Sequence, residues 1–331
     1  MKPTVATKHR RASRATGITV LVLLALVLGG WWQRQAMYDW LRLYNYTPST
    51  TAAQLATDGT MTDYARHVYY VNHPELKERS SFSSFCSTGT EQTVVLGCYK
   101  GGQRGIYLLQ VTNAELAGIQ QVTAAHEMLH AAYERLDSGE RQRVDSLLED
   151  YYHNQLTDET IKQTIEDYKK TEPNDLVNEM HSIFGTQIAT LPTELNEYYK
   201  QYFTDRSKVT GYYGSYEQAF TSRQQQIKQS DTQLNSWKTQ IDQLEADVKS
   251  QQADLQDRRN TLNRYKANGD AEAYNNGVDG FNAAVVSYNT NVTRLQNLIA
   301  DYNRLVEQRN SIAFEERQLV QSLSSSGIQQ Q

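Results

Sequence analysis

Residues His126-Glu127-Met128-Leu129-His130 form an H-E-x-x-H motif. In a helix, side chains four residues apart lie on one face, so His126 and His130 can place two imidazoles on one metal ion. The carboxylate of Glu127 then lies beside the metal, where it can take a proton from a water molecule. Two histidines and one acidic neighbour in this order favour Zn²⁺. The motif therefore predicts a zinc site for hydrolysis, with Glu127 as the base.

The residues around the motif follow the period of a helix. An apolar stripe with helical spacing comprises Val122, Ala125, Leu129, Ala132 and Leu136. His126, His130 and Tyr133 form the neighbouring stripe. The two histidines should thus lie at the edge of a buried face, where a metal is both held and reached. The alternative is a pair of ordinary surface histidines.

A catalytic zinc ion usually takes three protein ligands and leaves a fourth position for water. The metzincin spacing would need Gly at position 133 and His at position 136, where this chain has Tyr133 and Leu136. The best candidate for the third ligand is Glu179, which shares a predicted helix face with Leu176 and Ile183. A carboxylate in apolar surroundings is costly unless a cation compensates it.

Other residues remain open for the third ligand and for binding an oxyanion. His181, His153 and Asp150 are the other candidate ligands, although His181 lies about 200° around the helix from Glu179. The candidates for transition-state stabilisation are His181, Tyr199 and Arg206, together with Tyr198 and Tyr202. Packing or surface exposure is the competing explanation for each of them.

The segment from Asn178 to Gly185, N-E-M-H-S-I-F-G, resembles the N-E-x-x-S-x-I-F-G helix of the thermolysin-like gluzincins, with one residue fewer. In that family the glutamate of this helix is the third zinc ligand, so the resemblance implies that Glu179 binds the metal. The family often has an aspartate four residues later that orients a histidine ligand. Here that position is Ile183.

A broader resemblance covers about two thirds of the chain, excluding its C-terminal part. The segments Y-D-W-L-R-L-Y-N-Y (38–46), V-T-A-A-H-E-M-L-H (122–130) and N-E-M-H-S-I-F-G-T (178–186) are similar to uncharacterised membrane-anchored metallopeptidases of candidate-phylum bacteria. This resemblance implies a membrane compartment and a zincin-like fold.

The composition limits the class of protein. Of the 331 residues, 39 % are hydrophobic, and the mean hydropathy is -0.68. These values are low for one large globule, so we expect part of the chain to be extended and solvated. The net charge of -5 is mild, and no basic block lies beyond the extreme N-terminus. The charge pattern therefore argues against a nucleic-acid partner.

The N-terminus has the charge pattern of a membrane anchor. Residues 1–14 carry lysines and arginines but no acid, and an uncharged run follows over residues 15–33. A run of about 19 residues suffices to cross a bilayer as a helix. Positive charge keeps the upstream tail in the cytoplasm, so we expect a single-pass signal anchor in the cytoplasmic membrane with the later residues outside. A cleaved signal peptide is the alternative, although no A-x-A site follows the run.

Cys86 and Cys98 both fall in the part of the chain expected outside the cytoplasm. An even number of cysteines in that location predicts one disulfide that closes a short loop. Two free buried thiols are the alternative. The spacing matches no zinc-ligand pattern.

The middle of the chain should supply the scaffold for the metal site. Residues 34–60 indicate a juxtamembrane helix and linker, and residues 61–213 a zincin-like domain. Strands are expected at 67–71, 93–99 and 105–111, and helices at 139–152, 158–170, 174–190 and 193–203. The third strand, directly ahead of the motif helix, is the predicted edge strand for an extended peptide substrate.

Residues 214–323 follow a heptad pattern. Apolar residues recur every seven positions at Ile227, Leu234, Ile241, Val248, Leu255 and Leu262, and a second set runs from Val285 to Val306. The glycine-containing stretch 268–280 should interrupt the helix between them. We expect an antiparallel hairpin with arms of about 40 residues, followed by a disordered tail at 324–331. Polar seam positions leave partner proteins and self-association open.

These features predict an α+β fold in which a small antiparallel sheet and a mainly helical zincin-like domain lie between an N-terminal transmembrane helix and a C-terminal coiled-coil hairpin. The predicted function is that of an extracytoplasmic zinc metallopeptidase acting on peptides or proteins, cell-wall peptides among them. The alternatives are a non-catalytic cell-envelope scaffold and a regulator whose hairpin recruits or occludes a partner.

Overall fold

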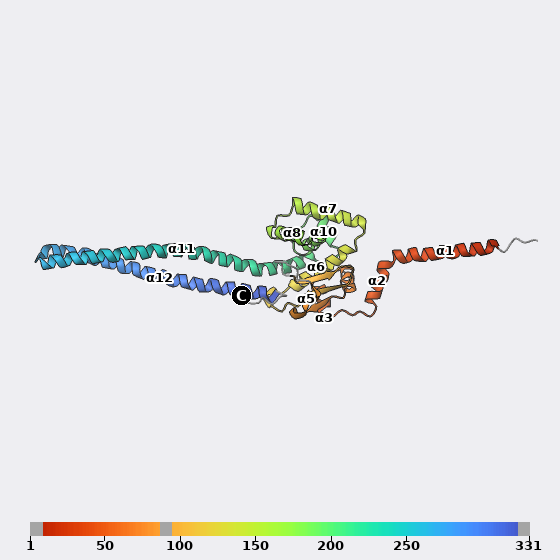
Figure 1. The fold of residues 1–331 in the computed structure, drawn as a ribbon, viewed down its shortest axis with the longest axis horizontal. Coiled ribbons are helices and arrows are strands. Elements are labelled where there is room, and N and C mark those ends of the chain that lie inside the picture. The colour runs from red at the N-terminus through yellow and green to blue at the C-terminus, as the bar shows by residue number, and fades with distance from the viewer. Residues whose placement is uncertain (1–8, 87–94, 324–331) are drawn as a thin grey trace, which may run out of the picture. The chain divides into compact units, whose positions relative to one another are not determined.

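The computed structural model describes residues 9–86 and 95–323, and its contacts divide the chain into two compact units. The first unit contains the described residues up to Thr112 together with residues 117–214. The second contains residues 113–116 and 215–323. Figure 1 follows the chain from helix α1 to helix α12.

The first unit is mostly helical, with one small sheet, and this confirms the predicted fold class. Its elements are α1 (His9–Trp32), α2 (Arg34–Leu43), α3 (Thr50–Asp58), α4 (Asp63–Val71), β1 (Glu75–Lys77), α5 (Arg79–Phe85), β2 (Gly97–Lys100), β3 (Gly105–Leu109), α6 (Ile119–Glu134), α7 (Ser138–Asn154), α8 (Glu159–Thr171), α9 (Leu176–Thr186), α10 (Thr193–Tyr199) and the start of α11 (Arg206–Ala267).

The membrane span predicted over residues 15–33 lies in α1 except for Gln33, and α2 follows it after a bend. Within the described part of the chain, no single helix has the length and mean hydropathy of a membrane span. Residues 18–31 and 34–43 reach those values as a pair, with a bend of 62° between them. The break lies at Gln33, which precedes α2.

The sheet is mixed, where the sequence predicted an antiparallel one. Its strand order is β1-β3-β2, with β1 parallel and β2 antiparallel to β3. β3 is therefore the central strand, and the prediction that residues 105–111 form the edge strand is wrong. β2 takes that edge position. Of the predicted strand 93–99, the first two residues lie outside the described residues.

The predicted strand at residues 67–71 is wrong, because these residues belong to α4. The side chain of Thr62 caps that helix by accepting a hydrogen bond from the backbone N–H of Ala65. Ala65, Val68 and Tyr69 are buried at helical spacing, so tertiary packing overrides the β propensity of this Tyr- and Val-rich run. The third strand is instead β1, a short segment that the sequence pattern missed.

Residues 50–58, within the predicted linker, form α3. Ser49 caps this helix by accepting from the backbone N–H of Ala52. Ala52, Leu55 and Ala56 are buried, and α3 packs against α6. The metal-motif helix thus packs against a segment that follows the N-terminal helices in the chain.

The second unit is a helical hairpin, which confirms that prediction. It consists of the 3-10 turn Ala114–Leu116, α11 from residue 215 onward, and α12 (Ala271–Leu323). The two helices are longer than expected, with 62 residues in α11 and 53 in α12. Only Asn268 to Asp270 interrupt them. The expected break over 268–280 is too long, because α12 accommodates Gly277 where it packs on α11: a Cβ there would lie 2.9 Å from Leu262.

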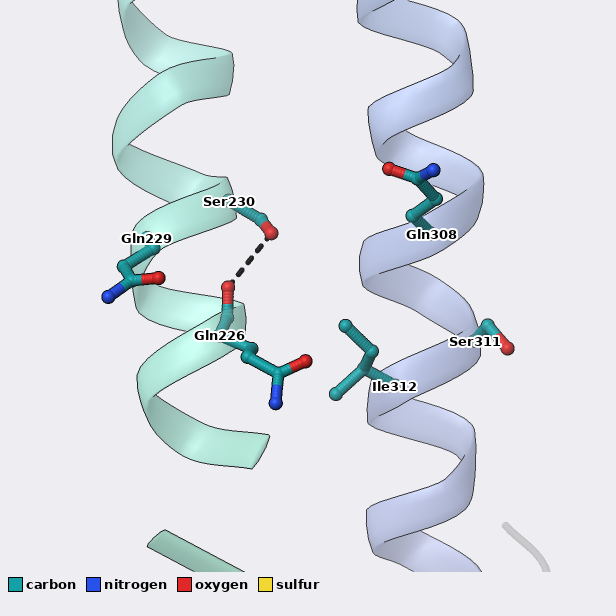
Figure 2. A pocket seen from close by; sticks show the side chains of 6 residues that line it. All are labelled: Gln226, Gln229, Ser230, Gln308, Ser311 and Ile312. Atoms are coloured by element: carbon teal, nitrogen blue, oxygen red, sulfur yellow. Dashed lines mark hydrogen bonds between the residues drawn. The ribbon is translucent and has the colours of Figure 1, made fainter. Parts of the chain in front are cut away.

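The seam of the hairpin includes polar pairs. Arg309 on α12 pairs with Asp231 on α11 at 3.0 Å, and Gln251 donates to Ser287 across the seam. Figure 2 shows one stretch in which Ile312 points toward α11 among polar side chains, namely those of Gln226, Gln229, Ser230, Gln308 and Ser311. Polar pairing of this kind fixes the register of two helices more than it stabilises them.

Candidate metal centre

The H-E-x-x-H motif lies in the middle of α6, on a helix as predicted. The helix begins after Gly118, whose φ of +97° favours glycine, and a side chain there would meet the ring of Tyr212 at 2.5 Å. Val122, Ala125, Leu129 and Ala132 are buried along one side. The side chain of His126 is 15 % exposed and that of His130 is 8 % exposed. Both imidazoles therefore lie at the edge of the buried face.

Helix α9 packs closely against α6 and carries Glu179. The contact is close at Gly185, where a Cβ would lie only 2.4 Å from the side chain of Leu129. Leu129 directly precedes His130 in the motif. This close approach brings the N-terminal half of α9 opposite the two histidines, so Glu179 faces them across the helix contact.

The three side chains His126, His130 and Glu179 form a group that can hold a metal ion. The Nε2 atom of His126 lies 3.6 Å from Oε2 of Glu179, and the Nε2 atom of His130 lies 3.5 Å from Oε1. One ligand atom from each of the three lies within 4.8 Å of the others. A tetrahedral ion with bonds of about 2.0–2.1 Å holds its ligand atoms roughly 3.4 Å apart. The spacing fits such an ion.

The burial of Glu179 favours binding of a cation. Its side chain is 8 % exposed, and its Oε2 atom has no hydrogen-bond partner among the described residues. Burial would favour the neutral acid, but the neighbouring His130 and His126 outweigh it and hold the pKa of Glu179 below its usual value. A buried carboxylate that stays ionised and has an unpaired oxygen is well suited to bind a metal.

The ionisable groups of the metal centre shift one another's pKa values. Burial lowers the pKa of His130, but the carboxylates of Glu179 and Glu127 more than offset this and raise it. Burial raises the pKa of Glu127, against the opposing effect of both imidazoles. A raised pKa makes the carboxylate of Glu127 a stronger base toward a water proton.

Strand β2 lies directly over Glu127. The carboxyl group of Glu127 accepts a hydrogen bond from the backbone N–H of Tyr99. A Cβ at Gly97 would come within 2.6 Å of Thr123 and 2.8 Å of the carboxylate of Glu127. Glycine at position 97 therefore lets the edge strand approach α6 and leaves the carboxylate of Glu127 in place.

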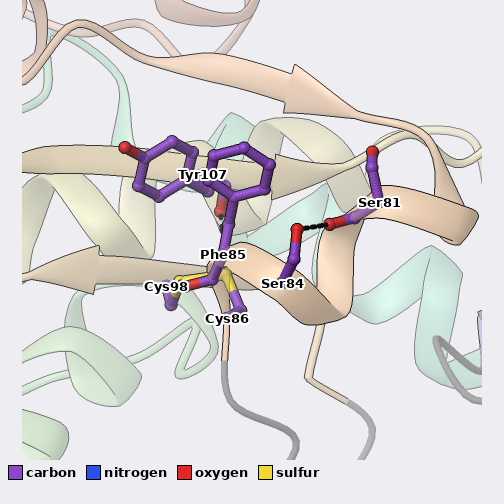
Figure 3. The surroundings of a disulfide bond; sticks show 6 residues. All are labelled: Ser81, Ser84, Phe85, Cys86, Cys98 and Tyr107. Atoms are coloured by element: carbon purple, nitrogen blue, oxygen red, sulfur yellow. Dashed lines mark hydrogen bonds between the residues drawn. A yellow bond between two sulfur atoms is a disulfide. The ribbon is translucent and has the colours of Figure 1, made fainter.

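A disulfide joins β2 to the preceding helix, as predicted. Cys86 follows α5 and is bonded to Cys98 in β2, with their Cα atoms 5.7 Å apart. Figure 3 shows the bond beside the rings of Phe85 and Tyr107. Phe85 and Tyr107 pack in a small apolar cluster with Phe82 and Leu109. The bond and this cluster hold the edge strand at the metal centre.

The cavity at the metal centre has a volume of about 230 Å³. It is lined by Val95, Gly97, Cys98, Tyr99, Lys100, His126, Glu127, His130, Tyr168, Glu172, Asp175 and Glu179. One wall is β2, and another is formed by the end of α8 and the connection to α9. Carboxylates outnumber the single lysine, so the cavity attracts cations.

The α8–α9 wall was missed by sequence reasoning. Oxygens of Glu172, Asp175 and Glu179 lie within 4.8 Å of one another, with the first two exposed. Asp175 accepts a hydrogen bond from Asn178 at 3.1 Å. Glu172 and Asp175 flank Pro173 in a connecting segment, and neither a motif nor a period points to them.

The candidate transition-state residues lie elsewhere in the first unit. His181 is fully buried and bonds Tyr198, and burial together with His130 and His126 lowers its pKa to about 3. Tyr199 donates to the backbone oxygen of His181 at 2.7 Å. Arg206 donates to the backbone oxygens of Ile188 and Ala189. None of the three is among the described residues that line the cavity.

The other candidate ligands also lie apart from the metal group. Asp150 accepts from Asn154 and Gln155 near the end of α7, and the ring of His153 stacks edge-on against Tyr152. Tyr198 and Tyr202 share a buried hydrogen bond of 3.0 Å. Glu179 is thus the candidate that the fold brings to His126 and His130.

Comparison of the chain with family models, with curated proteins and with solved structures finds no match.

Proposed function

We propose that this chain is a zinc-dependent peptidase attached to the outer face of the cytoplasmic membrane. The observation that carries the proposal is the convergence of His126, His130 and Glu179 at the spacing of a tetrahedral ion, with Glu127 beside them. Two imidazoles and one carboxylate are a ligand set of catalytic zinc sites, which leave one position for water.

The residues around the cavity divide the chemistry between them. His126, His130 and Glu179 would hold the ion. When bound, zinc would polarise a water molecule and the carbonyl of a substrate. Glu127 takes a proton from the attacking water and then returns it to the leaving amine, a role that its raised pKa supports. The N–H of Tyr99 orients that carboxylate.

An extended peptide is the substrate that the cavity wall favours. β2 lies at the edge of the sheet and lines the cavity beside the metal group. Edge strands bind extended peptides through backbone hydrogen bonds, with side chains alternating between the two faces. We propose that the substrate adds to β2, in the role the sequence had assigned to residues 105–111.

Two features support a location outside the cytoplasm. The Cys86–Cys98 disulfide is typical of oxidising compartments. The apolar helix pair at residues 18–31 and 34–43 follows a basic N-terminus, the charge order of an anchor whose tail stays inside.

The decisive experiment compares the full chain with the Glu127→Gln variant, both purified in detergent. Bound zinc is measured by mass spectrometry, and hydrolysis is measured on casein and on peptidoglycan-derived peptides. We expect Glu127→Gln to keep its zinc and to lose activity by at least about 100-fold, because the general base contributes that much. Glu149→Gln, an exposed carboxylate on α7, is the matched control and should keep full activity.

Equal activity of the wild type and Glu127→Gln would contradict the enzymatic proposal. Bound zinc without hydrolysis in the wild type would favour the second candidate, a cell-envelope scaffold or regulator with a zinc-binding head. The observation that favours this candidate is the helical hairpin of α11 and α12, which is far longer than a metal site of this size requires.

A further inference from the structure

Helix α2 has two chemically different faces. Gln35, Tyr38, Asp39 and Arg42 lie on one side and bond to other elements of the first unit. The other side carries Met37, Trp40, Leu41 and, just after the helix, Tyr44. These residues and Trp31 at the end of α1 are each 59–68 % exposed. The first set is called the inner face and the second, with Trp31, the outer face.

The inner face centres on the buried carboxylate of Asp39. Arg135 donates to both of its oxygens, at 2.8 and 3.0 Å, and His67 of α4 lies 2.8 Å away. Gln35 adds a fourth contact at 2.7 Å. Asp39 is 7 % exposed. A buried carboxylate with this many partners fixes the rotation of α2 about its own axis.

The inner face also connects α2 to the motif helix α6 and to the turn that follows the edge strand β2. Arg135 directly follows α6, the helix of the H-E-x-x-H motif. Gln103 lies in the turn between β2 and β3, and its backbone oxygen accepts from Tyr38 at 2.9 Å. Gln103 also exchanges side-chain hydrogen bonds with Gln35. The motif helix and the edge strand are thus both fastened to α2.

The outer face has the composition of a membrane interface. It holds two tryptophans, a tyrosine, a leucine and a methionine, all largely exposed. Tryptophan and tyrosine favour the headgroup level of a bilayer, where one part of the ring is apolar and another is hydrated. Arg34, at the start of α2, is exposed and lies over the ring of Trp31 at 4.7 Å, where it can pair with lipid phosphates.

We infer that the outer face of α2 lies in the headgroup layer of the bilayer and that α2 thereby fixes the metal centre at a set height above the membrane. The position of α2 rests on the anchor proposed for α1 and not on the proposed catalysis, whereas its consequence for the substrate rests on the proposed peptidase function. α2 starts two residues after α1 ends, so its first turn lies where the apolar run leaves the bilayer. A 62° bend after a helix along the membrane normal brings the next helix closer to the plane than to the normal.

The height of the metal centre limits which peptide bonds it reaches. A flexible tether would let the site sample bonds at many distances from the membrane. α2 is joined to α6 and to the β2–β3 turn by the Asp39 contacts, so the site moves with the helix. The substrates that fit are extended segments close to the membrane surface, such as the juxtamembrane stretches of other anchored proteins.

Tryptophan depth measurements test the inference on the full chain in phosphatidylcholine–phosphatidylglycerol vesicles. A chain that keeps Trp40 and carries phenylalanine at positions 31, 32 and 237 reports on α2. A chain that keeps Trp31 alone reports on the anchor. Each is quenched with lipids brominated near the headgroup or deep in the acyl chain, and with aqueous acrylamide. We expect headgroup-level brominated lipid to quench Trp40 strongly, acrylamide to quench it weakly, and its emission to shift to the blue.

The other results would overturn the inference in different ways. If Trp31 is quenched by lipid while Trp40 is quenched by acrylamide, the anchor stands and α2 lies in solvent. If lipid quenches neither residue, the anchor fails as well. If Trp40 is shielded from both quenchers, a protein surface such as a second copy of the chain covers the outer face. None of these readouts depends on hydrolysis.

A pair of matched variants makes the test specific to the outer face. Met37→Asn with Leu41→Asn should shift the emission of Trp40 back to the red and reduce its quenching by brominated lipid. Val286→Asn, which changes an exposed apolar residue in the hairpin, should leave both unchanged. An unchanged Trp40 signal in the double variant would also overturn the inference.

Discussion

Glu179 is the residue on which the metal centre depends most, because it brings the only carboxylate that faces both histidines of the motif among the described residues. Glu179→Ala should reduce zinc affinity by at least about 100-fold, since loss of a mere supporting contact already costs 10–100-fold in metal sites. Zinc titration with a chromophoric competitor measures this. Circular dichroism checks that the helices remain.

The matched control for that change is Glu172→Ala in the same cavity. Glu172 is exposed and groups with Asp175 and Glu179, but it is not part of the group that contains the two imidazoles. Its replacement should alter zinc affinity little. Equal losses in the two variants would mean that general negative charge in the cavity holds the metal, and not the geometry of Glu179.

Gly97 controls how closely the edge strand approaches Glu127, the proposed general base. Gly97→Ala would place a methyl group within 3 Å of Thr123 and of the carboxylate of Glu127, so β2 or Glu127 must shift. We expect hydrolysis to fall by at least about 10-fold while zinc remains bound, because misplacement of a reacting group by about 1 Å is costly. Gly101→Ala, in open space in the adjoining turn, is the control and should retain activity.

The sequence and the fold contribute different parts of this site. His126, Glu127 and His130 follow from a local spacing that any helix enforces, and Glu179 followed from an acid on an apolar face. Gly97, Glu172 and Asp175 could not be found in the same way. Their roles depend on which strand and which connection pack against α6, and that is decided by contacts between residues far apart in the chain.

At the scale of elements, α2 is held by charge more than by apolar packing. Asp39→Asn would leave the guanidinium of Arg135 buried without its partner, which should lower the free energy of unfolding of the first unit by about 3 kcal/mol. Chemical denaturation followed by circular dichroism measures the loss. Glu149→Gln changes an exposed carboxylate and should have no effect. Equal stability of both variants would show that Asp39 does not help to hold α2 on the first unit.

The two glycines within α12 provide an internal comparison for the hairpin. Gly280→Ala should stabilise the helix by about 1 kcal/mol through helix propensity, because its surroundings admit a Cβ. Gly277→Ala should gain less or lose stability, since the added Cβ would press on Leu262 at 2.9 Å. Thermal unfolding of the two variants tests this. Equal gains would mean that α11 and α12 do not pack closely at Gly277.

The errors in predicting elements have physical causes. Residues 67–71 carry β-branched and aromatic side chains, but a capping threonine and a buried helical face make them α4. β1 is short and contains Glu75 and Lys77, so no apolar alternation marks it. The heptads of the hairpin extend over many turns, so the two helices could be predicted. The glycines near the turn made the predicted break between them too long.

At the scale of the whole molecule, metal binding should stabilise one unit and leave the other unchanged. The proposed ligands all belong to the first unit, and the hairpin from residue 215 to residue 323 contributes none of them. A ligand that binds only the folded state stabilises it by about 4 kcal/mol at a thousand times its dissociation constant. Hydrogen–deuterium exchange of the full chain with and without zinc should therefore show slower exchange in α6 and α9 and no change in α11 beyond residue 215 or in α12.

The Glu179→Ala variant is the control and should abolish the difference. Slower exchange throughout the hairpin would instead mean that zinc couples the two units, and an effect that survives in Glu179→Ala would place the metal at another site.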